Sequence, residues 1–256
     1  MTCDDPRTIL TGTPPLYLDF SAEPGPAANQ VEIEITASGA VQGLPIVTVY
    51  QTGAAAGVEV SMGAGGPSGT FTGTASLSAA LPLEGKAVVS ATGAAGTAPY
   101  IFSFAIETIA AGESATLWSL DGQAELYLPA GSLPGGARVT IQPANVATLA
   151  AGSLAAQAVG TELVPLVGPF RVTSSSGDAL SNEASLSLFY SDASGLALGT
   201  DPTTARIYRW TGGQWVPLES AVDQDHRYVS ATLSDLGTYA LWSEASWRTY
   251  VPLLAK

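Results

Sequence analysis

The sequence contains few charged residues, one histidine and one cysteine, and each shortage excludes a class of site. Only 12% of the 256 residues are charged, about half the usual fraction. With His226 and Cys3 as the single residues of their kinds, the chain holds neither a histidine-rich metal site nor a zinc cluster. A single cysteine also excludes a disulfide within the chain.

Positive charge is also scarce. Nine Lys and Arg residues stand against 22 Asp and Glu residues, so the formal net charge is −13, and the basic residues form no cluster. Because phosphate binding depends on concentrated positive charge, we expect neither nucleic acid nor an anionic membrane surface as a partner. No apolar run reaches the length of a transmembrane helix, so membrane insertion is not expected. We interpret the negative charge of this acidic protein as an aid to solubility.

The N-terminal stretch "MTCDDPRTIL" lacks the basic start and apolar run of a signal peptide. A composition rich in Thr, Gly and Ala and poor in lysine is nevertheless typical of exported β proteins. We therefore expect a mature or trimmed part of an extracellular or cell-surface protein. Cys3, followed by two aspartates, would suit a lipidated N-terminus, but no lipobox precedes it.

Alternation of apolar and polar residues predicts seven short strands in the first half. In "VEIEIT", residues 31–36, one valine and two isoleucines share a face opposite two glutamates. The other predicted strands are residues 16–20, 45–50, 57–62, 70–77, 86–91 and 100–106. About seven strands in roughly 100 residues is the number found in an immunoglobulin-like or fibronectin-type sandwich.

The second half differs in composition, since all five tryptophans lie beyond residue 114. Its predicted strands are residues 115–119, 124–129, 137–143, 161–167, 170–174, 184–191, 205–210, 214–219, 227–233 and 238–242. Residues 145–160 are compatible with one or two helical turns, although Gly152 weakens that prediction. Strands do not alternate with long amphipathic helices, so a parallel α/β fold is not expected.

The segment "DGQAELYLPAGSLPGGARVTIQP", residues 121–143, resembles the opening of the ZU-type domains of ankyrins and netrin receptors. In both, an apolar strand runs into a Pro-Ala-Gly corner and a second strand follows. The segment "LSLFYSD", residues 186–192, and residues 205–242 are similar to the closing part of bacterial surface domains of the same broad type, and the similarity covers about residues 113–243. The first half is similar to immunoglobulin-like modules of bacterial extracellular proteins. These resemblances imply a fold more than an activity.

We therefore predict an all-β protein of two tandem antiparallel β-sandwiches. The first is immunoglobulin-like over residues 1–110 and the second ZU-like over residues 111–245, while residues 246–256 form a tail or an added strand. The resemblance implies a non-catalytic structural or adhesive module of a secreted or surface-anchored bacterial protein. Its expected partners are other domains of a larger protein or cell-surface polymers, and no cofactor is expected.

The segment "RWTGGQW", residues 209–215, predicts a β-hairpin in which Trp210 and Trp215 face each other across the strands. If both rings are exposed and coplanar, they could stack on sugar rings, and carbohydrate binding is the alternative function. If they are buried, the pair stabilises the hairpin and covers the core, which is the favoured interpretation.

His226 raises the question of self-cleavage, because some relatives of these domains cut their own chain at a histidine followed two residues later by Ser or Thr. Here the next serine, Ser230, is four residues on, about 13 Å along an extended strand, beyond the reach of a hydrogen bond. We predict that His226 lies in an exposed turn and that the chain stays uncut.

Other chemistry has weaker support. A Ser-His-Asp triad would use His226, but no Gly-x-Ser-x-Gly elbow accompanies it. Nothing in the sequence pairs two carboxylates as a glycosidase requires, and no enzymatic activity is expected. Asp223 and Asp225, with Asp201 or Asp192, could offer oxygen ligands to calcium, although a full calcium loop supplies more of them.

Overall fold

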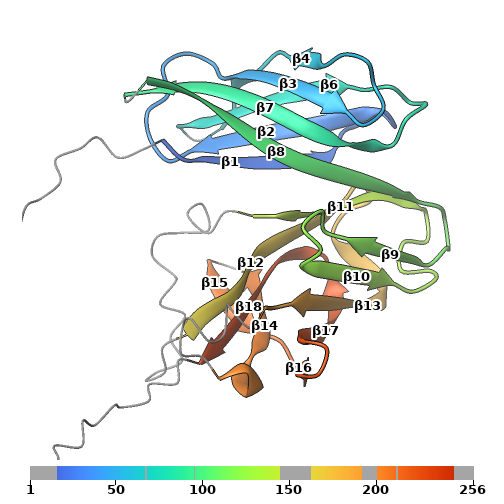
Figure 1. Ribbon diagram of the computed structural model, residues 1–256. Helices are drawn as coiled ribbons and strands as arrows, with labels where there is room; N and C mark the ends of the chain where they lie inside the picture. The colour runs from blue at the N-terminus through green and yellow to red at the C-terminus, as the bar shows by residue number, and fades with distance from the viewer. Residues whose placement is uncertain are drawn as a thin grey trace, which may run out of the picture.

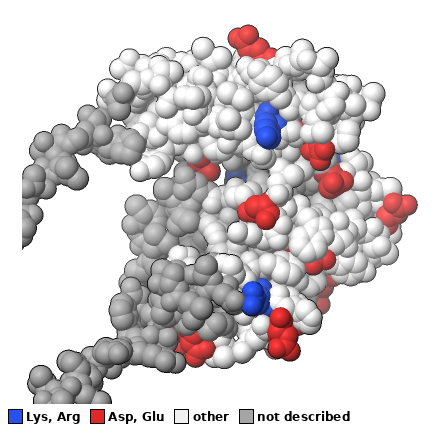
Figure 2. Space-filling model, viewed as in Figure 1, with Lys and Arg blue, Asp and Glu red and all other residues white. Residues whose placement is uncertain are grey.

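The computed structural model describes residues 16–66, 68–94, 96–144, 163–191, 201–211 and 213–244. These residues form three antiparallel sheets and one short 3-10 turn, η1 (Pro202–Thr204), which confirms the predicted all-β class. Within these ranges, no helix has the length and apolarity needed to span a membrane. Charged side chains are scattered over a mostly uncharged surface on the face shown in Figure 2.

The strands of the first half follow the predicted alternation. They are β1 (Leu18–Pro24), β2 (Gln30–Ala37), β3 (Ile46–Gln51), β4 (Val58–Val60), β5 (Gly63–Ala64), β6 (Thr70–Ser76), β7 (Leu83–Gly93) and β8 (Gly96–Ile109). In β2 the valine and isoleucines are buried and the glutamates between them are exposed, as "VEIEIT" predicts. β5 was not predicted, because a glycine and an alanine carry no alternation.

The second half contains ten strands. They are β9 (Ala115–Trp118), β10 (Ala124–Leu128), β11 (Ala137–Pro143), β12 (Leu163–Ser174), β13 (Ala179–Phe189), β14 (Arg206–Thr211), β15 (Gln214–Pro217), β16 (Ser220–Asp223), β17 (Tyr228–Asp235) and β18 (Gly237–Glu244). Strand β12 joins residues 163–167 and 170–174, which belong to two separate predicted strands (161–167 and 170–174), and its register against β18 shifts near Val167. The helical prediction for residues 145–160 and the tail 246–256 lie outside the described residues.

The three sheets enclose two hydrophobic cores. One sheet has the order β1-β2-β6-β5, the second β16-β17-β13-β10-β9, and the third runs β15-β14-β18-β12-β11-β8-β7-β3-β4. The first core lies between the four-stranded sheet and the β8-β7-β3-β4 part of the nine-stranded sheet. The second lies between the five-stranded sheet and the remainder of the nine-stranded sheet. The large sheet therefore serves both cores.

Strand β8 joins the two halves. It is 14 residues long and pairs with β7 through most of its length. Its last four residues also pair with β11, from Ile106 opposite Thr140 to Ile109 opposite Ala137. Figure 1 shows β8 extending from the upper strands toward the lower half. The side chain of Thr140 adds a hydrogen bond from its Oγ1 to the carbonyl oxygen of Ala105, 2.7 Å away. Backbone pairing thus links residues on either side of the boundary predicted at residue 110.

Candidate functional site

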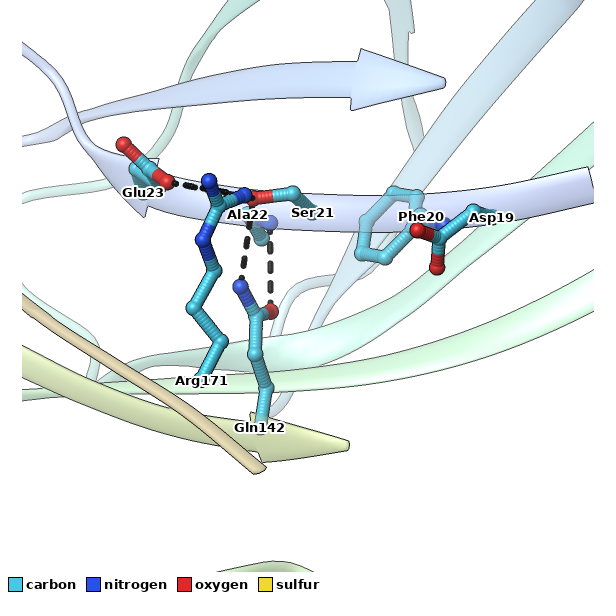
Figure 3. Close-up of polar contacts among 7 residues, drawn as sticks. All are labelled: Asp19, Phe20, Ser21, Ala22, Glu23, Gln142 and Arg171. Carbon is cyan, nitrogen blue, oxygen red and sulfur yellow. Dashed lines mark hydrogen bonds and ion pairs between the residues drawn. The ribbon is translucent and has the colours of Figure 1, made fainter. Parts of the chain in front are cut away.

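Strand β1 lies at the edge of its sheet, and side chains from the second half contact that edge (Figure 3). Gln142 on β11, which is 4% exposed, accepts a hydrogen bond from the backbone N–H of Ala22 at 3.1 Å. Its Nε2 donates to the hydroxyl of Ser21 at 3.3 Å. A buried amide thus satisfies an unpaired N–H of the edge strand, which would otherwise be free to pair with another chain.

Two arginines extend this contact. The Arg138 guanidinium donates to the carbonyl oxygens of Ala27 at 2.7 Å and Gln30 at 3.2 Å, and also to that of Gly25. Arg171 Nη1 lies 3.4 Å from a carboxylate oxygen of Glu23. Since the side chains of that ion pair are 42% and 37% exposed, it contributes at most about 1 kcal/mol.

A hollow of about 800 Å³ lies beside this contact, between the outer face of the four-stranded sheet and Arg171. It is lined by Ser21, Glu23, Glu32, Ile33, Glu34, Ser61, Thr72, Gly73, Thr74 and Arg171. Glu23 and Glu32 are direct cross-strand partners, a pairing of carboxylates that the sequence did not reveal. Among the described residues, no group of three or more His, Cys, Asp or Glu side chains could hold a metal ion. The hollow is acidic but has no recognisable catalytic arrangement.

Trp210 and Trp215 face each other across the β14–β15 hairpin, as predicted. Their ring centroids are 5.3 Å apart and the ring planes are inclined by 60°. Trp215 is only 7% exposed and also contacts Trp242 of β18, with ring centroids 5.9 Å apart. The pair is therefore neither coplanar nor fully exposed, and this geometry favours packing on the sheet over stacking on sugar.

Asp223, Asp225 and His226 lie together in the turn between β16 and β17. Asp223 accepts hydrogen bonds from the His226 backbone N–H at 2.9 Å and from its Nδ1 at 3.0 Å. The His226 side chain is 77% exposed, in keeping with the predicted turn. Asp201 is engaged elsewhere, since its Oδ1 accepts from the backbone N–H and the hydroxyl of Thr203. The structure brings Asp223 and Asp225 together but adds no third carboxylate among the described residues; Asp192 lies outside them.

We expect a single intact species when the purified chain is incubated and its mass measured. His226 bonds to Asp223 and points to solvent, so no element of the described turn directs it to a hydroxyl nucleophile. A His226→Ala variant should give the same result. Two fragments whose masses sum to that of the chain plus one water would contradict this prediction.

The His226–Asp223 contact should be visible in a titration. The hydrogen bond that His226 Nδ1 makes to Asp223 raises the pKa of His226 above its ordinary value of 6.5, while the hydrogen bonds that Asp223 accepts from the His226 backbone N–H and side chain hold the pKa of Asp223 below its usual value. Asp223→Asn should move the His226 pKa back toward 6.5, measured from the imidazole resonances by NMR. Because the folded-state pKa is raised, the contact stabilises the fold at low pH, and this contribution is lost as pH rises through that pKa. An unchanged pKa in the Asp223→Asn variant would contradict the assignment.

The contact residues of the two halves were not recognised in the sequence, although one signal was available. Arg138, Thr140 and Gln142 alternate with buried apolar residues in "ARVTIQP" and so share one face of β11. The sequence could not show that this face meets β1. The chain gives no match to family models, to curated proteins or to solved structures. The resemblance to immunoglobulin-like and ZU-type domains therefore stays a prediction.

Proposed function

We propose that this chain is a non-catalytic structural module of an extracellular or surface-anchored bacterial protein, holding neighbouring domains at a fixed separation. In this proposal the first core belongs to an immunoglobulin-like sandwich and the second to a ZU-like sandwich. Its partners are flanking domains of the same protein or polymers of the cell surface. The observation that carries the proposal is the nine-stranded sheet shared by both cores.

A shared sheet resists the motion that a linker permits. Domains joined by a linker normally move relative to one another unless the interface is large. Here rotation of one half would break the β8–β11 pairing between Ile109 and Ala137 and between Ile106 and Thr140. It would also break the contacts that Arg138 and Gln142 make with the first half. Such a connection suits a spacer, whose task is to keep its ends at a constant distance.

The acidic hollow and the exposed His226 both support a non-catalytic role. The acidic hollow is lined by Arg171 and three carboxylates, and His226 is not among its lining residues. His226 is itself exposed and paired with Asp223. We propose no cofactor.

Single-molecule energy transfer tests the spacer role. With Cys3→Ser as background, dyes would be attached at Ala54→Cys and Gln224→Cys, two exposed turn positions in different halves. We expect one narrow distance distribution on the full chain. A broad or two-peaked distribution would overturn the proposal, as would turnover in a screen of glycoside, ester and peptide substrates.

Removing the Arg138 side chain should destabilise the protein by about 1–2 kcal/mol, because three carbonyl oxygens lose a charged donor at a half-exposed position. The exposed Arg206 provides the control, and Arg206→Ala should change the free energy of unfolding by less than about 0.5 kcal/mol. Urea denaturation measures both. Equal effects in the two variants would show that the contact between the halves adds no stability.

A further inference from the structure

The outer face of the five-stranded sheet carries a row of three aromatic rings. Trp118 on β9 and Phe189 on β13 have ring centroids 5.3 Å apart and planes inclined by 30°. Phe189 and Tyr228 on β17 have ring centroids 5.5 Å apart and planes inclined by 45°. Since β10 lies between β9 and β13, the row crosses four strands of the sheet.

These rings lie on the side of the sheet away from the core. Their sequence neighbours Leu117, Leu188 and Val229 are buried in the second core, so the alternation of each strand directs the aromatic side chain outward. Trp118 is 50% exposed, and Phe189 and Tyr228 are half-buried. A cluster of large rings on a solvent-facing sheet contributes little to the core and is typical of a binding surface.

Small hydroxyl side chains and one further ring lie beside the row, since Tyr127 of β10 is 45% exposed and lies opposite Ser185. On the same face Ser187 lies opposite Ser230, and Ser185 opposite Thr232. Glu125 of β10 lies opposite both Trp118 and Ser187. Beside these short side chains, the rings of Trp118 and Tyr127 are exposed to solvent. Hydroxyl and carboxylate groups therefore border an apolar strip.

A shallow hollow of about 540 Å³ continues the strip at its Tyr228 end. It is lined by Ala221, Val222, Asp223, Gln224, Asp225, Tyr228 and Ser230. The hollow thus combines one ring with two carboxylates, an amide and a hydroxyl. These groups can donate and accept several hydrogen bonds at the edge of a stacked ligand.

This combination matches the chemistry of a sugar polymer. A pyranose ring with equatorial substituents presents a flat face of C–H groups, which packs on an aromatic ring, and a rim of hydroxyl groups, which bonds to carboxylate, amide and hydroxyl side chains. Glu125, Asp223 and Asp225 give the surface negative charge, so an anionic polymer would be repelled. Aromatic rows also stack nucleic-acid bases, but those sites depend on a basic groove, and no lysine or arginine lines this hollow.

We propose that this face binds an uncharged, extended polysaccharide of equatorially linked pyranoses, the chemistry shared by cellulose-type glucans and chitin. The polymer lies across β9 to β17, stacks on the exposed ring of Trp118, and contacts the accessible parts of Phe189 and Tyr228 along the row. This site is distinct from Trp210 and Trp215, which belong to a strand pair of the nine-stranded sheet. It adds a binding activity to the spacer role and does not depend on it, because the dye-distance measurement tests that role separately.

Sedimentation with insoluble polymers tests the proposal on the full chain. Wild-type protein would be incubated with microcrystalline cellulose and, separately, with chitin, and the bound fraction measured over a range of polymer concentrations. We expect saturable retention on at least one of the two that persists in 0.5 M salt, since the ligand is uncharged. The polymer that binds the protein more tightly shows whether the site prefers a cellulose-type glucan or chitin.

Three variants locate the binding site. Trp118→Ala should weaken binding at least tenfold, whereas Trp118→Tyr, which keeps a ring, should recover part of the affinity. Tyr50→Ala is the matched control, because Tyr50 is also 50% exposed but lies on β3 in the first half, and it should bind like wild type. Circular dichroism would confirm that each variant is folded.

The proposal is overturned by any of three results. The first is no retention of the wild-type protein on either polymer. The second is equal binding by the Trp118→Ala variant and wild type, or an equal loss in the Trp118→Ala and Tyr50→Ala variants. The third is retention that disappears at 0.5 M salt, which would indicate an electrostatic contact with a charged contaminant of the polymer.

Discussion

Replacing Tyr239 with alanine is expected to lower the free energy of unfolding by about 3–5 kcal/mol, the range for removing a large aromatic side chain from a core. Tyr239 is 1% exposed and lies on β18, where its cross-strand partners are Phe170 of β12 and Arg209 of β14. Its hydroxyl donates to the carbonyl oxygen of Asp235, four residues earlier. The ring therefore fills the second core, and the hydroxyl fixes the corner between β17 and β18.

The phenylalanine variant separates these two contributions. Tyr239→Phe keeps the ring and removes only the hydroxyl, so it should cost about 1 kcal/mol, the usual contribution of one hydrogen bond. Urea denaturation of both variants at pH 7 gives the comparison. A loss in the Tyr239→Phe variant as large as that in Tyr239→Ala would show that the bond to Asp235 matters more than the packing of the ring.

Alkaline pH provides an independent test of the same residue. Burial raises the pKa of Tyr239 to about 12, from 10 in the unfolded chain. A group whose pKa is raised by folding contributes full stability below its unfolded pKa, and this contribution is lost as pH rises. Between pH 10 and 12 the wild-type protein should therefore lose about 2 kcal/mol through Tyr239. The Tyr239→Phe variant should lose less over this interval, and identical slopes in the two proteins would contradict the assignment.

Local alternation explains why most strands could be predicted from the sequence. In β2 the period of two is uninterrupted, and the exposed and buried residues are those that "VEIEIT" indicates. The β14–β15 hairpin was likewise predicted, because its turn and both strands lie within one short segment. Such features depend on neighbours along the chain, which the sequence displays directly.

Features that depend on the order of strands could not be predicted. Trp118, Phe189 and Tyr228 each occupy an outward position that alternation indicates, yet only the order β17-β13-β10-β9 brings their rings together. The exposure of Trp215 was undetermined for the same reason, since Trp242 reaches it from β18. The strand that pairs with each edge is determined by packing between segments distant in sequence, and no short motif indicates it.

The pairing of β8 with β11 is a long-range contact of this kind, and it connects the two halves of the chain. Gly136 lies next to it. Gly136 has a φ of +70° and directly precedes Ala137, the partner of Ile109. A Cβ at this position would lie 2.9 Å from both the carbonyl oxygen of Ile109 and the backbone nitrogen of Ala111. Glycine is therefore required twice here, for the left-handed backbone and for the close approach of two chain segments.

Gly136→Ala should accordingly destabilise the protein by about 2–4 kcal/mol, combining the left-handed conformation, about 1–2 kcal/mol, with displacement of the end of β8. Gly122→Ala is the matched control, because Gly122 has a φ of +68° in the β9–β10 turn but nothing within 4 Å of its added Cβ. It should lose only the backbone contribution. In hydrogen exchange, the backbone amides around Ile109 and Ala137 should lose protection in the Gly136→Ala variant alone. Equal losses of stability in the two variants, with protection retained at Ile109, would show that close packing of this turn does not secure the connection between the halves.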